Sequence, residues 1–165
     1  MNIPTKQSLL ARPKYPPALQ LTERDVEILQ AVWTFRFLSA NQVVALLGGS
    51  EQAIKNRLRQ LFKARYLDRP REQMTMRFRD GYPDIVYAIG DRGSRVLVEQ
   101  LGLDLATTRW EYRNRSVQER FLRHTLSVSN FLIALILATA KRRDVILLDW
   151  QREGQELRNR FRATT

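Results

Sequence analysis

The stretch from Ser50 to Leu67, SEQAIKNRLRQLFKARYL, constrains the fold more than any other part of the sequence. Ser50 is a favourable N-cap, because its hydroxyl can accept a hydrogen bond from a free backbone amide of the first helical turn. Four apolar residues then recur at the spacing of one stripe on an α-helix: Ile54, Leu58, Leu61 and Phe62. The sequence therefore predicts an amphipathic helix that packs on a core with its polar face outward.

The polar face of this helix carries side chains that suit DNA. At about 100° per residue, the side opposite the apolar stripe holds Gln52, Asn56, Arg59, Gln60 and Lys63. Asparagine and glutamine amides can pair with adenine in the major groove, and arginine can pair with guanine. Positive charge for phosphates flanks this face at Lys55, Arg57 and Arg65. Considered without its neighbours, the helix is better explained as an ordinary solvated helix, so the surrounding sequence decides between the two interpretations.

The charge balance favours a polyanionic partner. The chain has 28 Lys and Arg against 17 Asp and Glu, a formal net charge of +11, which suits nucleic acid or an anionic membrane surface. The absence of cysteine excludes disulfides and thiolate metal sites, and it suits a reducing compartment. The first twenty residues lack the apolar segment of a secretion signal, so we expect a cytoplasmic protein.

One uncharged run tests the membrane alternative. Residues Thr125 to Ala140 precede three basic residues, as a membrane span often does. The run is shorter than the roughly 20 residues that a spanning helix needs, and it contains Ser127, Ser129 and Asn130. We therefore expect a buried helix here and no membrane association.

The first 102 residues divide into an arm and a compact domain. Residues 1–20 hold four of the six prolines and three positive charges, which predicts an extended basic arm that contacts DNA. Capping boxes predict helix starts at Thr22 and at Ser39, and Gly48-Gly49 ends the second helix just before Ser50. Helix, short helix, glycine turn and basic helix follow in the order of a helix-turn-helix, so residues 21–102 are predicted to be its domain.

A hairpin is predicted directly after the basic helix. Gln73–Phe78 and Ile85–Ile89 resemble strands, and the segment between them is rich in turn-forming residues. A hairpin in this position is the wing of a winged helix, and Arg77 and Arg79 near its tip are expected to contact the sugar-phosphate backbone. A further helix, Asp91–Leu101, is expected to close the domain at Gly102.

Residues 103–165 are predicted to form a C-terminal segment for dimerisation or partner binding. A long helix is expected from a capping box at Ser116 to about Arg143, then a strand from Asp144 to Trp150 and a frayed end. The helix carries two apolar stripes, the first with Val117, Phe121, Val128, Leu132 and Leu135, the second with Leu122, Leu126, Ile133 and Leu137. One stripe suffices to dock the helix on its own domain. The second predicts a homodimer through residues 116–143, although the C-terminal strand is an alternative cover.

The sequence offers little support for an enzyme. His124 has no carboxylate or cysteine at ligand spacing, and the glycines form neither a phosphate-binding loop nor a dinucleotide fingerprint. Asp149, Glu153 and Glu156 are interpreted as surface charge. We expect no catalysis, no cofactor and no metal.

Three segments resemble a known family: LTERDVEILQAVWTFRFLSANQVVALL, IKNRLRQLFKARYLDRP and VYAIGDRGSRVLVEQLG, followed by RFLRHTLSVSNFLIAL. They are similar to the winged-helix part of the replication-relaxation proteins of bacterial plasmids and mobile elements. The resemblance covers about residues 21–138. It implies DNA binding linked to replication, plasmid DNA relaxation or transcription. Members often continue into a further segment, so we expect either a short member or a fragment of a longer protein.

The sequence thus predicts an α+β, mainly α protein: a winged helix-turn-helix domain followed by a long helix and a short strand. Its expected function is sequence-specific binding of double-stranded DNA, as a transcriptional regulator or as a replication or relaxation factor of a mobile element. Two alternatives remain open. The chain could assemble with a replication initiator or relaxase, or its basic face could bind an acidic protein. A nuclease recruitment domain would need residues that this chain lacks.

Overall fold

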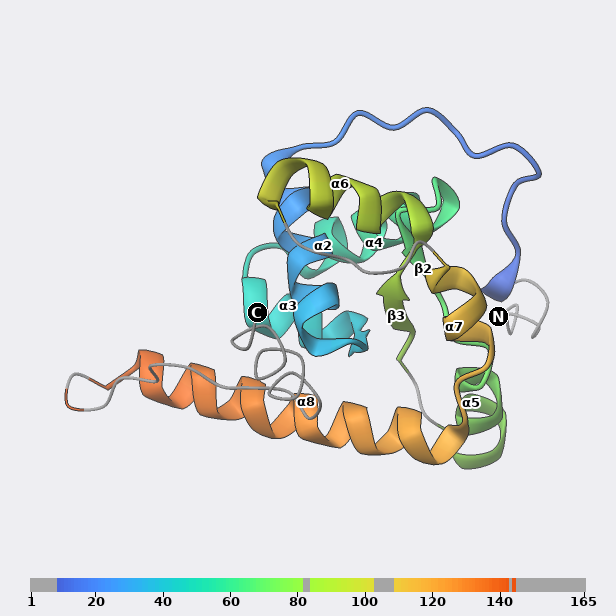
Figure 1. Ribbon diagram of the computed structural model, residues 1–165. Helices are drawn as coiled ribbons and strands as arrows, with labels where there is room; N and C mark the ends of the chain where they lie inside the picture. Colours follow the sequence, from blue (N-terminus) through green and yellow to red (C-terminus); the bar gives the residue numbers. More distant parts are fainter. Residues whose placement is uncertain (1–8, 82–83, 103–108, 143, 145–165) are drawn as a thin grey trace, which may run out of the picture.

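The computed structural model describes residues 9–81, 84–102, 109–142 and 144 (Figure 1). The described part is mainly helical with one small antiparallel sheet, as predicted. Its elements are α2 (Glu23–Phe35), β1 (Leu38–Ser39), α3 (Ala40–Leu47), α4 (Glu51–Lys63), β2 (Leu67–Asp68), α5 (Gln73–Asp80), β3 (Val86–Ile89), α6 (Asp91–Leu101), α7 (Trp110–Arg115) and α8 (Glu119–Ala140).

The first three long helices begin where their capping residues predict. The Asp25 carboxylate accepts a hydrogen bond from the Thr22 backbone amide at 2.7 Å, and the Thr22 hydroxyl accepts one from the Asp25 amide. Ser39 and Gln42 form the same reciprocal pair at the start of α3. The Ser50 hydroxyl accepts from the Ala53 amide at the start of α4. Local sequence therefore sets all three boundaries.

The sheet places β3 between the two shorter strands. β1 pairs with β3 in antiparallel register, Leu38 opposite Tyr87, and β2 pairs with β3 with Leu67 opposite Ile89. All four residues of β3 are buried, as expected for a central strand that helices cover. Both α2 and α7 pack against this strand.

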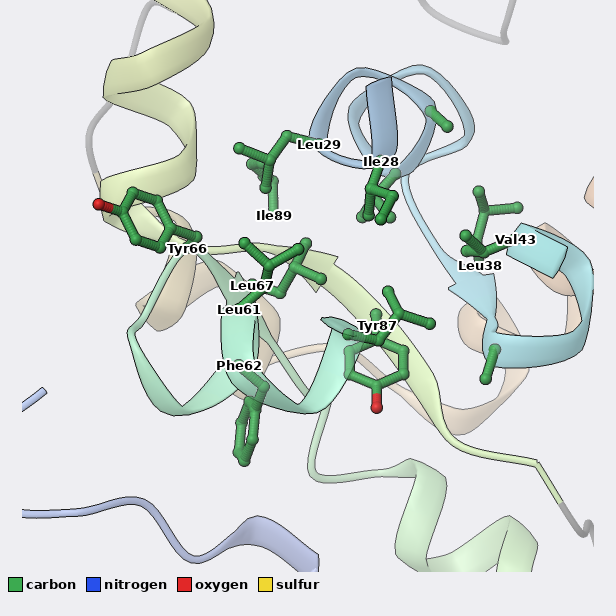
Figure 2. Packing of buried hydrophobic residues seen from close by; sticks show 14 of the residues in the cluster. Ile28, Leu29, Leu38, Val43, Leu61, Phe62, Tyr66, Leu67, Tyr87 and Ile89 are labelled. Carbon is green, nitrogen blue, oxygen red and sulfur yellow. The ribbon is translucent and has the colours of Figure 1, made fainter. Parts of the chain in front are cut away.

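One hydrophobic core joins the sheet to the helices. Figure 2 shows Ile28 and Leu29 of α2 facing Leu61, Leu67 and Ile89. All five side chains are almost fully buried. Across this core, the Trp110 ring at the start of α7 packs edge to face on Trp33, with 5.0 Å between the centroids. The described part of the C-terminal segment is thus continuous with the core that α2, α4 and the sheet form.

The predicted hairpin is wrong in its first strand. Residues 73–80 form helix α5, and the antiparallel partners of β3 are β1 and β2. The Gln73 side chain explains the difference, because it takes the place of a strand beside Val86. Its amide oxygen accepts from the Val86 amide at 2.8 Å, and its amide nitrogen donates to the Val86 carbonyl at 2.9 Å. A side chain on a helix therefore satisfies the backbone groups that the hairpin was predicted to satisfy.

The predicted C-terminal helix is present as the single helix α8, and a short helix that was not predicted, α7, precedes it. Ser116 is the C-cap of α7, and its hydroxyl donates to the Arg113 carbonyl at 3.0 Å, so the capping box predicted there is wrong. Helix α8 begins at Glu119 after Gln118 and ends at Ala140. The strand predicted from Asp144 to Trp150 lies outside the described residues except for Asp144, and the predicted frayed end lies wholly outside them.

Helix α8 docks on the domain along the second predicted stripe. Its buried residues are Leu122, Leu126, Ser129 and Ile133, and it packs against α3, α5 and β1 (Figure 1). The fourth member of that stripe, Leu137, is 37% exposed. By length and composition α8 could also cross a membrane, but core helices of soluble proteins share these properties.

Two residues of the first predicted stripe stay exposed, whereas Val117 and Leu132 pack against the core. Phe121 is 53% exposed and Val128 is 41% exposed, and Phe131 on the same side is 67% exposed. Asn130 of α8 accepts a hydrogen bond from the Gln42 side chain of α3 at 2.5 Å. The two sides of α8 therefore differ: one contacts the domain and the other leaves large apolar side chains in solvent.

Candidate nucleic-acid interface

Helix α4 has the amphipathic arrangement that its sequence predicts. Its apolar stripe, Ile54, Leu58, Leu61 and Phe62, is buried in the core. The predicted base-reading residues are all exposed: Gln52, Asn56, Arg59, Gln60 and Lys63. Burial of the stripe fixes the helix by its inner side and leaves these five polar side chains on the outer one.

The turn before α4 is held in place from α2. Gly48 and Gly49 have φ angles of 66° and 95°, a conformation that glycine adopts at little cost. The Arg24 guanidinium donates to the carbonyls of Leu47 at 2.7 Å and Gly48 at 2.6 Å. These bonds satisfy carbonyls at the C-terminal end of α3, so helix, turn and helix form one supported unit.

Arg57 does not belong to the exposed face. Its Nε and Nη2 atoms donate to the two carboxylate oxygens of Asp25, both at 2.5 Å, and Nη2 also donates to the Gln20 carbonyl at 2.7 Å. Burial raises the pKa of Asp25, but the hydrogen bonds from Arg57 and Thr22 outweigh it and hold this pKa below its ordinary value. Arg57 therefore ties α4 to the start of α2, and the sequence could not distinguish this role from a phosphate contact.

The other polar residues of α4 form local contacts. The Lys55 ammonium pairs with Glu51 at 2.7 Å, which raises the pKa of Lys55 and keeps it charged. The Arg59 guanidinium donates to the Asn56 side-chain oxygen. Among the described residues, Lys63 has no ion-pair partner. Pairs of this kind on an exposed helix surface contribute little to stability, so DNA can replace them at small cost.

The two arginines predicted at the wing tip lie on α5. Arg77 is half-buried and borders the groove described next. Arg79 lies in the last turn of α5, and its side chain is outside the described part of the structure. The prediction that these arginines sit on a hairpin is wrong, although α5 still carries Arg77 to the side of α4.

A groove of about 590 Å³ separates α4 from α5 and from the start of the described chain. It is lined by Leu9, Ala11, Ala40, Gln52, Lys55, Arg59, Phe62, Lys63, Arg69, Arg77, Asp84, Ile85 and Tyr87. In Figure 2 the Phe62 ring and the Tyr87 hydroxyl project from the core on the same side. The predicted residues Gln52, Lys55, Arg59, Lys63 and Arg77 are thus brought together, whereas Asn56 and Gln60 lie outside this lining.

Sequence reasoning missed Arg69 and Tyr87. The Arg69 Nη2 atom donates to the Tyr87 hydroxyl at 2.9 Å, and Arg69 is 9% exposed. One feature could have indicated Arg69, because an arginine next to a buried strand rarely lacks a partner. Because Tyr87 pairs with β1 across the sheet, its contact with Arg69 depends on tertiary structure.

The arm contributes to stability through Arg12. Its guanidinium pairs with Asp68 at 2.7 Å and with Glu111 at 3.1 Å, and donates to the Leu67 carbonyl at 2.7 Å. Residues 11–20 have no helix or strand, which agrees with the predicted extended arm. The charge of Arg12 is nevertheless used within the protein. Residues 1–8 lie outside the described chain.

Other candidate chemistry finds little support in the described residues. His124 is exposed on α8, and no group of three His, Asp or Glu side chains among the described residues could hold a metal ion. Asp149, Glu153 and Glu156 lie outside them.

The family model for replication-relaxation proteins matches residues 29–163, most of the chain. The chain belongs to the replication-relaxation family. The resemblance seen in the sequence is thereby confirmed, and membership links the chain to the replication and relaxation of mobile elements. No curated protein and no solved structure matches it. The match to the replication-relaxation model begins within α2 and includes α4 and all of the groove lining except Leu9 and Ala11.

Proposed function

We propose that this replication-relaxation protein binds double-stranded DNA in a sequence-specific manner and performs no catalysis itself. It acts in the replication or relaxation of a mobile element, or regulates transcription there. The observation that carries the proposal is the outer face of α4, where five exposed polar side chains lie on a helix fixed from below by its buried stripe. A second helix, α3, precedes it across a supported glycine turn, as in helix-turn-helix proteins that read DNA.

In the proposed complex, α4 lies in the major groove. Asn56 and Arg59 lie three residues apart on its outer face and reach base edges, where a bidentate amide or guanidinium discriminates between bases. Lys55, Lys63 and Arg77 lie at the sides of this face and contact phosphates, which fixes the position of the helix without reading sequence. The hydrogen bond between Arg59 and Asn56 holds both side chains over the outer face before DNA arrives.

We further propose that two copies associate through α8. Phe121, Val128 and Phe131 leave a row of large apolar side chains exposed on one side of this helix. Such patches are uncommon on monomers, and a two-fold partner would cover this one while presenting a second α4 to the next half-site. If a different protein covers the patch, the chain is an accessory factor that assembles with a replication initiator or relaxase.

Selection of bound sites from a pool of random duplexes tests the proposed function. We expect one enriched sequence, bound at least 1000-fold more tightly than random duplex at one fixed salt concentration, since specific binders reach roughly that ratio. Replacing Asn56 or Arg59 with alanine should cost about 1–3 kcal/mol on the selected site and much less on random duplex. Lys141→Ala, an exposed charge at the far end of α8, is the matched control. Failure to enrich any sequence, with the protein folded, would overturn sequence-specific binding.

A further inference from the structure

Arg69 is a buried cation at the groove. It is 9% exposed, and its Nη1 and Nη2 atoms donate to the Leu9 carbonyl at 2.5 Å and the Tyr87 hydroxyl at 2.9 Å. Its Nε atom is buried without a hydrogen-bond partner. Among the described residues, no carboxylate lies within ion-pair distance of Arg69. The guanidinium is thus held by a carbonyl, a hydroxyl and two aromatic rings, with 4.1 Å from its central carbon to the centroid of Phe62.

A buried charge in such surroundings is unfavourable. Removing a guanidinium from water costs several kcal/mol unless an opposite charge compensates it. Burial lowers the pKa of Arg69, and repulsion from Arg12 and Arg59 lowers it further. Arg12 is compensated by Asp68 and Glu111, but Arg59 contacts a neutral amide. Positive charge therefore accumulates beside Arg69 without an equal negative charge.

The rest of the groove lining increases this imbalance. Lys63 and Arg77 add positive charge, and Lys55 is paired with Glu51. Asp84 is the single carboxylate among the lining residues, and its two oxygens already accept from the backbone amides of Asn41 at 2.7 Å and Ile85 at 2.9 Å. Arg59, Lys63 and Arg69 have no carboxylate partner among the described residues, so an anion from outside would complete this part of the groove.

The apolar part of the lining strengthens attraction for such an anion. Leu9, Ala11, Ala40, Phe62 and Ile85 border the same space. They lower the local dielectric constant, so that each charge acts over a longer distance than it would on an open surface. A volume of about 590 Å³ is within the range of pockets that hold small molecules.

We propose that this groove is a phosphate-binding site. Lys63, which is accessible, donates to the phosphate oxygens, and Arg69 supplies buried positive charge beneath them. This inference rests on the proposed function, because the expected source of the phosphate is the DNA that α4 binds. A free nucleotide offers the same chemistry, so the experiment compares both sources.

The first arm uses the full-length chain without DNA. Its thermal unfolding is followed with inorganic phosphate and with a mononucleotide, against sodium chloride at equal ionic strength. We expect phosphate to raise the midpoint above that in chloride, and Arg69→Met to weaken phosphate binding by about tenfold. Lys63→Ala, on the surface of α4, should weaken it as well, which keeps the test valid if Arg69→Met does not fold. Lys141→Ala should bind phosphate like the wild type.

The second arm measures duplex binding by the same variants across a range of salt. If the phosphate comes from DNA, Arg69→Met should lower duplex affinity about tenfold. It should also flatten the slope of log affinity against log salt by about 0.9, the value for one phosphate contact. Tight binding of the mononucleotide, with duplex affinity unchanged in Arg69→Met, identifies a free nucleotide as the ligand. If phosphate and nucleotide fail to bind and Arg69→Met leaves the duplex affinity unchanged, the site is refuted while the proposed function stands. Phosphate binding without any duplex binding would refute the proposed function and leave the site.

Discussion

Replacing Arg57 with methionine separates the structural arginine of α4 from Arg59, the exposed arginine that we propose contacts DNA. The change removes two charge-assisted hydrogen bonds to Asp25, one to the Gln20 carbonyl and one to the Gln60 side chain. Hydrogen bonds to charged groups contribute about 1.5–3 kcal/mol each, and breaking a buried ion pair costs about 3–5 kcal/mol. Arg57 is partly exposed, however, and Asp25 keeps its bonds from Thr22. We therefore expect the free energy of unfolding to fall by about 2–3 kcal/mol at pH 7.

The pH dependence of this loss provides the sharper test. In the wild type, the lowered pKa of Asp25 stabilises the folded state above the ordinary pKa, and this stabilisation disappears as pH falls through the folded value. Without Arg57, burial still raises the Asp25 pKa and only the hydrogen bonds from Thr22 still lower it, so this pKa is higher in the variant and the variant takes up a proton at a higher pH than the wild type. The difference in stability between the two proteins should thus shrink as the pH is lowered from 7 towards 4.

Urea unfolding at several pH values measures this difference. Arg59→Met is the matched control, because it is the same substitution on the same helix at an exposed position, and it should change stability by less than about 0.5 kcal/mol. Duplex binding below the unfolding temperature should show the reverse order, with Arg59→Met weakened and Arg57→Met nearly unchanged. A loss at Arg57 that stays constant from pH 7 to pH 4, or one no larger than that of the control, would refute the role assigned to the ion pair.

Three further predictions follow from the packing. Gly93→Ala should destabilise the fold by about 2 kcal/mol or more in urea unfolding, because its Cβ would lie 2.1 Å from the Tyr66 carbonyl oxygen; a neutral effect would contradict this packing. Gln73→Leu should cost about 2–4 kcal/mol by the same measurement, since both backbone groups of Val86 lose their partner, and wild-type stability would count against that role. Light scattering should give a dimer mass for the wild type and a monomer mass for the folded Val128→Glu, Phe131→Glu variant; a wild-type monomer at micromolar concentration would exclude the dimer.

The light-scattering test of the dimer changes Val128 and Phe131, a choice of side that the sequence alone does not make. In the sequence, the stripe with Leu126 and Ile133 and the stripe with Phe121 and Val128 are equally apolar, so either can face a partner. The structure buries the stripe with Leu126 and Ile133 against the domain, and glutamate at either residue would disrupt the fold itself. Periodicity shows that a helix has two apolar sides, but which side its own domain covers depends on tertiary contacts.

Much of the first half of the domain follows from local sequence. Thr22, Ser39 and Ser50 each cap the helix that they were predicted to cap, because the bonds involved span only three residues. The apolar stripe of α4 is likewise buried as its spacing requires. The role of Arg57, in contrast, does not follow from local sequence. It lies at the edge of the polar face, and nothing near it in sequence indicates that Asp25, 32 residues earlier, lies beside it.

The segment 73–80 shows how a tertiary contact changes the function of a residue. Its alternation of polar and apolar residues is typical of a strand, but over so few residues the pattern does not exclude a helix. The contact between Gln73 and Val86 resolves the ambiguity, because the amide completes the hydrogen bonding of β3 while the segment coils into α5. As a consequence, Arg77 borders the groove beside α4 instead of extending from a hairpin tip. The sequence therefore indicated a basic residue near α4, but placed it on a hairpin, and the groove that Arg77 borders depends on the helix that replaced the strand.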